Sequence, residues 1–409
     1  MNSEINFLKL ISKYKTVAII FINTLALYLI VCFISQFLVN DLKKKIQILN
    51  PDSNLIRATY PNYKDLNINE ALKIFKEYSA PGSKYQSFIG YRRNQFSGDV
   101  VNVDSNGFRI STNHKINDSV WFLGGSTMWG TGSDDNNTIP SIYAKITNKS
   151  VLNLGESGYN SFQELIQLQI LLANGYKPEI VIFYDGANDG GIFCKKNNFP
   201  QLQHSYTSRY DNMIRENRNL RKKLENKKIL DIEYLVFKLK SFFLMPLTYF
   251  NKLDEYNDAK SKKNSHTKTE NIKKNKKYLH CDDKNYAEKA AQFTISSWLN
   301  AYFILKEQNI PVKFILQPTA SYYHHKYQLD HIIDYKKQAI INEEDSFVGY
   351  YEKLKQLWHL KCAKLNICDS FIDLSKVFFD LNEEIFIDRV HISPNGNKII
   401  ATKIASDIL

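Results

Sequence analysis

The sequence has few of the residues that several kinds of fold and site require. Its 409 residues include only 16 glycines and 10 prolines, too few for a fibrous or collagen-like chain. Its five cysteines are too sparse for a small disulfide-rich scaffold. No Walker loop, Rossmann fingerprint or zinc-ligand spacing occurs, so the sequence implies no metal and no other cofactor. With 44% hydrophobic and 13% aromatic residues, the chain can bury a large core, which excludes global disorder.

Positive charge is concentrated in one segment. The formal net charge is +12, and residues 209–277 alone hold 19 Lys and Arg against 9 Asp and Glu. The remainder is nearly neutral, so we expect no nucleic acid as a partner. Two interpretations of the segment stay open. It is either a contact for an anionic lipid or polymer, or a solvated lysine-rich loop.

An uncharged apolar run covers residues 17–39. As a helix its 23 residues would cross the roughly 30 Å hydrocarbon core of a bilayer with some tilt. The run is longer than the apolar part of a cleaved signal peptide, and Asp41 and three lysines follow it instead of a cleavage site. We therefore expect an N-terminal tail at residues 1–16, a transmembrane anchor at 17–39, and a stalk and lead-in at 40–115.

The cysteines bear on the side of the membrane that holds the large domain. Lysines flank the anchor on both sides, so the positive-inside rule is nearly balanced. Cys32 lies in the apolar run, and the other four form an even set. Their positions favour the pairs Cys194–Cys281 and Cys362–Cys368 over four separate thiols. Disulfides would place the domain outside the cytoplasm. Together with a composition typical of AT-rich bacterial genomes, they predict a single-pass protein of a bacterial inner membrane with a periplasmic domain.

From residue 119 onward, short β patterns alternate with helical ones. Strands are expected at 119–123, 151–154, 180–184 and 312–316, and helices after 161 and at 286–308, 347–365 and 394–408. This alternation predicts an α/β fold, a parallel sheet covered by helices on both faces, over residues 116–409. The basic insertion, about residues 195–283, interrupts the alternation.

An apolar stretch inside the insertion, residues 235–250, contains Lys238, Lys240 and Pro246 and is therefore a poor second span. Three placements stay open: on the membrane surface, along an acyl pocket, or packed as a helix against the core. The last is the favoured one.

Glycine and polar residues follow the ends of the expected strands. The segments are GGST at residues 124–127, NLGESG at 153–158 and DGAND at 185–189, with DRVH at 388–391 before the last helix. Ligands of an open parallel sheet bind beyond the carboxyl ends of its strands. We therefore expect these four segments to meet at one edge of the sheet.

Their side chains are those that acyl transfer requires. A serine hydroxyl needs a base to take its proton, and an imidazole oriented by a carboxylate provides one near neutral pH. Ser126, His391 and Asp388 supply these groups. The tetrahedral intermediate needs preorganised donors for its oxyanion, which the N–H groups of Ser126 and Gly158 and the Asn188 amide would provide.

These blocks, in this order, resemble the four signature blocks of the SGNH (GDSL-like) hydrolase superfamily. The name-giving residues correspond to Ser126, Gly158, Asn188 and His391, and Asp388 completes the triad. The resemblance implies a flavodoxin-like three-layer α/β/α sandwich. It also implies a serine esterase whose partner is an acylated carbohydrate or another small ester.

The first block departs from the family pattern at one position. Gly125 stands where the family commonly has Asp. That Asp is not the triad acid, so the departure blurs the subfamily and leaves catalysis plausible.

Other residues near the blocks carry weaker hypotheses. Trp129 is either a substrate contact or part of the core, and Gln317 begins a loop that would line the cleft. His324 and His325 follow in that loop, without metal-ligand spacing, and are assigned to the surface or to substrate contact.

Two further polar residues receive structural roles. Asp189 is expected to cap the next helix, with a hydrogen bond to the site as the alternative, and Arg109 to order the entry to the sheet without a catalytic role.

The sequence thus predicts a membrane-anchored serine esterase that removes small acyl groups, acetyl above all, from cell-envelope carbohydrate. An O-acyltransferase with the same acyl-enzyme is one alternative. A non-catalytic envelope protein that binds or assembles glycans is another.

Overall fold

The chain forms two compact units. The computed structural model describes residues 2–49, 53–194, 239–265, 281, 284–320 and 346–408. One unit, the helical unit, comprises Met1–Ser53 and Asn217–Lys274; the other, the sheet unit, comprises Asn54–Glu216 and Asn275–Leu409.

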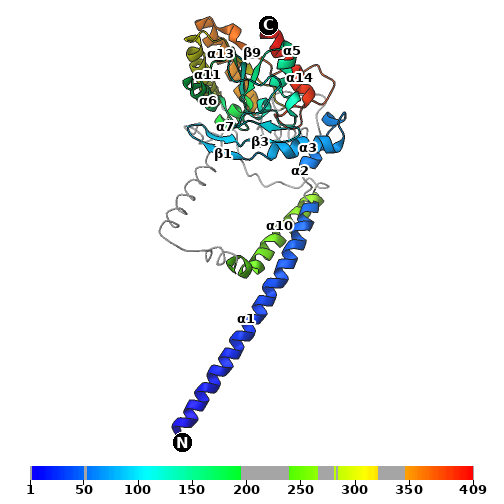
Figure 1. The fold of residues 1–409 in the computed structure, drawn as a ribbon, viewed down its shortest axis with the longest axis vertical. Helices are drawn as coiled ribbons and strands as arrows, with labels where there is room; N and C mark the ends of the chain where they lie inside the picture. The colour runs from blue at the N-terminus through cyan, green and yellow to red at the C-terminus, as the bar shows by residue number, and fades with distance from the viewer. Residues whose placement is uncertain are drawn as a thin grey trace. The chain divides into compact units, whose positions relative to one another are not determined.

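The sheet unit is built on a five-stranded sheet with the order β6-β5-β7-β8-β9 (Figure 1). Every neighbouring pair of these strands is parallel. The strands are β5 (Val120–Gly124), β6 (Val151–Asn153), β7 (Ile180–Asp185), β8 (Val312–Leu316) and β9 (Phe371–Asp373). The first of these strands in the sequence, β5, is an inner strand, and β6 lies beside it at one edge. Strands β7, β8 and β9 then follow in order on the other side of β5. Such a reversal of direction opens a crevice at the carboxyl ends of the strands.

Helices cover both faces of this sheet. Trp121 and Leu123 of β5 face α6 (Ser161–Ala173), α11 (Lys284–Lys306) and α13 (Ser346–Leu365). Val120 and Phe122 face α5 (Ile139–Thr147) and α14 (Pro394–Ile408). Successive residues of a strand point to opposite faces, so one buried strand contributes to both cores. The three-layer α/β/α fold that the sequence predicts is confirmed.

Strand β9 had no signal in the sequence. It has three residues and is only half-buried, which is too short for a periodic pattern to emerge.

Residues 54–115, interpreted from the sequence as stalk and lead-in, pack within the sheet unit. Their elements are α2 (Ser53–Ala58), η1 (Pro61–Tyr63), α3 (Ile68–Ser79), β1 (Ser83–Gln86), β2 (Gly90–Arg93), β3 (Phe96–Ser97) and β4 (Asn102–Val103). Tyr63 and Phe75 enclose Ile387, and Val101 and Val103 pack on Trp129. This segment, which we call the lead-in, therefore contributes its own side chains to the core.

The helical unit contains α1 (Asn2–Leu49) and α10 (Met245–Ser265), which contact each other. Among the described residues, Tyr14–Lys45 is the one stretch of helix long and apolar enough to cross a membrane, and its most apolar 18 residues have a mean hydropathy of 2.7. A signal sequence can meet the same criterion. Most of the basic segment 209–277 lies outside the described residues. The described part of the apolar stretch, residues 239–250, belongs to the helical unit, where Phe243 contacts Tyr28 of α1.

Two disulfide bonds, both in the sheet unit, join the pairs that the sequence favours. They are Cys194–Cys281 and Cys362–Cys368. Cys32, in α1, is free and buried.

Candidate active site

A tight turn after β5 presents Ser126. The strand ends at Gly124, and the single-turn helix α4 (Ser126–Trp129) begins two residues later. A side chain at Gly124 would lie 2.6 Å from Cβ of Met128, so the strand and the helix are too close for any residue but glycine. Gly130 ends the helix with φ 98°, a left-handed conformation that glycine adopts readily. The turn thus fixes the direction of the Ser126 side chain.

Ser126, His391 and Asp388 form one hydrogen-bonded chain. Nε2 of His391 lies 2.6 Å from Oγ of Ser126. Nδ1 of the same ring lies 2.7 Å from Oδ2 of Asp388. The serine and the histidine are 265 residues apart in the sequence, yet the fold brings them within bonding distance. The distances are those that a nucleophile, its base and an orienting acid require.

The Asp388 carboxylate is stabilised in its charged form. Its Oδ1 accepts hydrogen bonds from the backbone N–H groups of Val390, at 3.0 Å, and His391, at 2.9 Å. Burial raises the pKa of Asp388, but the His391 charge and these hydrogen bonds outweigh it and hold the pKa well below its ordinary value. A guanidinium nitrogen of Arg57, in α2, lies 3.8 Å from the carboxylate. Nothing in the sequence near Arg57 signalled this contact.

The expected oxyanion donors belong to the segments that follow β5, β6 and β7. The N–H of Ser126 is at the start of α4, where no intrahelical acceptor exists. Gly158 has φ 82° in the loop after β6, a conformation that favours glycine. Nδ2 of Asn188, in α7 (Ala187–Phe193), donates to the Tyr159 carbonyl at 2.6 Å. A Cβ at Gly125 would lie 2.2 Å from that nitrogen, so the Asn188 amide is adjacent to the serine's own turn.

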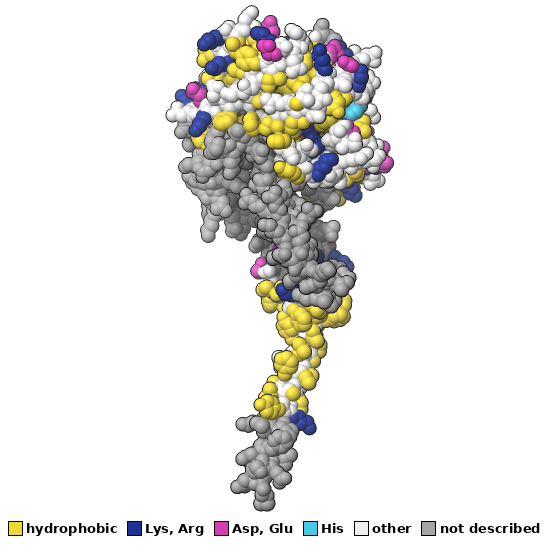
Figure 2. Space-filling model, turned by 60° about the vertical axis from the view of Figure 1, so that its left-hand side comes forward, with side chains coloured by type: hydrophobic (Ala, Val, Ile, Leu, Met, Phe, Trp, Pro, Cys, Tyr) yellow, Lys and Arg dark blue, Asp and Glu magenta, His cyan; other side chains and the backbone are white. Residues whose placement is uncertain are grey.

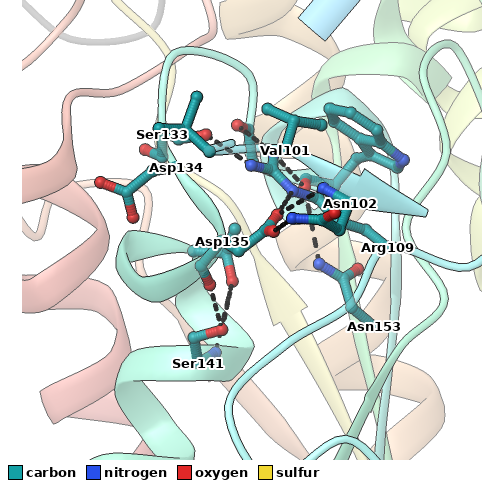
Figure 3. Close-up of polar contacts among 12 residues, drawn as sticks. Val101, Asn102, Arg109, Ser133, Asp134, Asp135, Ser141 and Asn153 are labelled. Atoms are coloured by element: carbon teal, nitrogen blue, oxygen red, sulfur yellow. Dashed lines mark hydrogen bonds and ion pairs between the residues drawn. The ribbon is translucent and has the colours of Figure 1, made fainter. Parts of the chain in front are cut away.

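Arg109 binds the segment that follows Ser126, and Figure 3 shows its contacts with Ser133 and Asp135. Its guanidinium is fully buried and donates to the carbonyls of Trp129 at 3.1 Å, Gly130 at 2.8 Å and Ser133 at 2.6 Å. A further bond, 3.0 Å long, joins its Nε to Asp135. Arg109 thus binds the last carbonyls of α4 and the loop after it, a more specific role than the sequence assigned.

A second arginine holds the loop that carries Gly158. The buried Glu156 carboxylate accepts from the backbone N–H of Arg93 at 3.0 Å and from its Nε at 3.3 Å. Another guanidinium nitrogen of Arg93 donates to Oγ of Ser157 at 2.9 Å. The hydroxyl of Tyr91 donates to the carbonyl of Ser157 at 2.6 Å. No pattern in the sequence marks Arg93 or Tyr91, which both belong to the lead-in.

Three carboxyl groups are buried close enough together to repel one another. They belong to Asp185 at the end of β7, Asp189 in α7 and Glu164 in α6, and all are almost inaccessible to solvent. Burial, together with their mutual repulsion, raises the pKa of Glu164 and raises that of Asp185 to about 8. Asp189 accepts hydrogen bonds from the backbone N–H and the hydroxyl of Ser161, the first residue of α6. It therefore caps a helix, but a neighbouring one and not its own.

Trp129 and Gln317, the two weaker candidates for substrate contact, are both buried. Trp129 is fully buried, with the guanidinium of Arg109 centred 4.4 Å from its ring, so the structure gives it a core role instead. Gln317 is also buried, and its carbonyl accepts from the Tyr351 hydroxyl at 2.9 Å. His324 and His325 lie outside the described residues. Within the described part of the chain, no group of three or more His, Cys, Asp or Glu side chains is placed to hold a metal ion.

Comparison with known proteins gives one sequence family and several distant structures. The model of the GDSL-like lipase/acylhydrolase family matches residues 120–404. No curated protein sequence matches the chain.

Three solved structures were compared with the chain. A G-D-S-L family protein from Desulfitobacterium hafniense DCB-2 is 12% identical, with 71% of this chain and 100% of that one covered and a TM-score of 0.33. The acetyl xylan esterase AlAXEase is 15% identical, with 71% and 99% covered and a TM-score of 0.34. A G-D-S-L family protein from Veillonella parvula DSM 2008 is 12% identical, with 70% and 96% covered and a TM-score of 0.34. Scores this low carry no argument about substrate.

Proposed function

We propose a specific active site for this chain, which belongs to the GDSL-like lipase/acylhydrolase family and is an ester hydrolase. Ser126 is the nucleophile, His391 the general base and Asp388 the orienting acid. The observation that carries the proposal is the hydrogen-bonded chain from Oγ of Ser126 through the imidazole to the carboxylate, with distances of 2.6 and 2.7 Å.

The geometry supports a two-step acyl transfer. As Oγ of Ser126 attacks the ester carbonyl, its proton passes to Nε2 of His391, and the imidazolium is stabilised by Asp388. The histidine then donates that proton to the leaving alcohol, and an acyl-serine remains. In the second step a water molecule attacks the acyl carbonyl as the same nitrogen takes its proton, and the imidazolium then returns that proton to Oγ of Ser126 as the free acid leaves.

Three donors would hold the oxyanion during both steps. They are the N–H groups of Ser126 and Gly158 and the second amide hydrogen of Asn188. The other amide hydrogen of Asn188 is bonded to the Tyr159 carbonyl, and this bond fixes the plane of the amide. Donors held in place before the reaction need no reorganisation when charge develops on the oxygen, which is the source of their effect.

The proposed setting is a bacterial inner membrane, with the sheet unit on the periplasmic side. Support comes from the apolar helix Tyr14–Lys45 and from the two disulfide bonds, which persist in oxidising compartments. A domain held there meets the cell envelope, so the proposed substrates are small acyl esters, acetyl esters above all, on envelope carbohydrate.

An activity-based probe tests the nucleophile. The full-length protein in detergent is treated with a fluorophosphonate, and the adduct is mapped by mass spectrometry. We expect an adduct on Ser126 that is absent in Ser126→Ala and His391→Ala. Ser406→Ala, which removes an exposed hydroxyl from α14, serves as the matched control. Labelling of Ser126 that survives in His391→Ala would refute the proposed base.

Product analysis separates the hydrolase from the transferase. The purified protein is given one acetyl donor together with a carbohydrate acceptor. Free acetate as the main product supports the esterase. Acetylated carbohydrate as the main product, in place of acetate, would contradict the esterase and support the O-acyltransferase, which uses the same acyl-enzyme.

A further inference from the structure

One face of α1 is covered over the C-terminal part of the helix. Cys32, Ser35, Val39 and Leu42 are buried, and their spacing of three and four residues places them on one side of the helix. By contrast, every residue from Tyr14 to Val31 is exposed. The element that contacts α1 here is α10. The apolar anchor therefore has a protein partner along half of its length.

The contact begins near the middle of the apolar run. The hydroxyl of Tyr28 donates to the carbonyl of Phe243 at 2.6 Å, and the two rings stack with centroids 6.1 Å apart. Tyr28 is the central residue of the run 17–39. Further along, Tyr249 and Tyr256 are near enough to Lys45 to interact with its charge. The two segments thus run in the same direction, from the middle of the anchor to its charged end.

The outward side of the second segment is apolar as well. Leu244, Leu247 and Phe250 recur every three residues and are 54%, 59% and 60% exposed. Figure 2 shows such apolar side chains in yellow on the described part of this unit. The first charged residue after them is Lys252, which pairs with Glu255. From Met245, where α10 begins, to Lys252 the helix rises about 10 Å, roughly a third of a hydrocarbon core of about 30 Å.

We propose that residues 243–251 enter the membrane beside α1 and reach about its middle, with lipid hydrocarbon on the exposed face of Leu244, Leu247 and Phe250. This inference rests on the proposed anchoring of the chain by α1. It adds a second membrane contact to the single span, formed by a stretch too short to cross by itself.

The backbone fits this environment. An unpaired carbonyl in hydrocarbon costs several kcal/mol. The chain turns at Leu244, between two helical stretches, and the Tyr28 hydroxyl bonds the carbonyl of Phe243 beside that turn. Pro246 lies in the first turn of α10, where a missing N–H has no consequence.

Spin-label depth measurements on the full chain in phospholipid vesicles test the inference. In a Cys32→Ala background, single cysteines replace Leu247, Phe250 and Lys252. Leu27→Cys, in the exposed part of α1, reports on the anchor, and Ile146→Cys, on α5, reports on the aqueous sheet unit. Retained fluorophosphonate labelling of Ser126 shows that each variant is folded.

We expect the label at position 247 to be accessible to oxygen, protected from a water-soluble nickel chelate, and about 7 Å deeper than the label at 252, from five residues at 1.5 Å each. A label at 247 that the chelate reaches as readily as the one at 146 overturns the inference. Protection from both reagents also overturns it, because another protein surface would then cover this face. If the label at 27 is aqueous as well, the anchoring itself fails, which separates the two conclusions.

Discussion

The strand-end loops and the lead-in contribute to the same site in different ways. The loops supply the groups that would react with substrate, Ser126, His391 and Asn188 among them. The lead-in supplies groups that hold those loops, and Arg109 and Arg93 do so through backbone carbonyls and a buried carboxylate. The reactive groups are partly exposed, whereas both arginines are buried. The comparison indicates that the active site depends on residues that never meet the substrate.

The largest expected effect belongs to the loops. Asp388→Asn keeps the shape of the side chain but loses the charge and leaves the imidazole in the wrong tautomer, so we expect kcat to fall by roughly 10⁴. Steady-state hydrolysis of an aryl acetate measures the change. Asp380→Asn, outside the site, is the control. A loss of less than tenfold would mean that Asp388 does not orient His391.

A smaller loss is expected at the oxyanion. Asn188→Ala removes one donor, and we expect kcat to fall roughly 10²–10³-fold with little change in KM, because the bond forms mainly in the transition state. The same hydrolysis assay measures both parameters. An effect confined to KM would assign Asn188 to substrate binding instead.

The lead-in is tested at Arg109. Arg109→Lys keeps the charge but cannot reach three carbonyls and Asp135 together, and we expect a loss in kcat of roughly 10–100-fold from a displaced nucleophile. The rate of fluorophosphonate labelling should fall in parallel, at unchanged KM. Lys115→Met, which removes an exposed ion pair, is the control. A fall in Tm without any fall in the labelling rate would reduce Arg109 to a purely structural residue.

The smallest effect is expected on stability and depends on pH. The raised pKa values of Glu164 and Asp185 mean that the folded protein binds more protons than the unfolded chain, so the free energy of unfolding falls as the pH rises from about 4 toward 8. Glu164→Gln removes one of these groups and a negative charge beside the other. We expect its Tm to fall less over this range than that of the wild type. Glu288→Gln, at an exposed ion pair, should follow the wild type. An equal fall in Glu164→Gln would contradict the role of the buried acids.

The two regions also differ in how much their sequences reveal. Glycines and polar residues directly after apolar strands mark the loops, and the parallel sheet brings the strand ends together, so Ser126, Gly158 and Asn188 could be located by pattern. The contacts of Arg93 and Arg57 with carboxylates follow no spacing rule, because Glu156 and Asp388 lie 63 or more residues away on other parts of the fold. Trp129 was ambiguous because an aromatic ring beside a nucleophile is equally compatible with a cleft and with a core. The contact of Tyr28 in α1 with Phe243 likewise joins residues 215 positions apart.

The Cys194–Cys281 bond has a consequence for the covalent topology of the chain. It joins two buried residues 87 positions apart, at the two ends of the insertion. The polypeptide between these two cysteines, which includes the described residues 239–265, is therefore a loop closed by a covalent bond. A protease that cuts the chain once between Cys194 and Cys281 yields two fragments joined by the disulfide bond. They migrate as one molecule in a gel until a reductant is added.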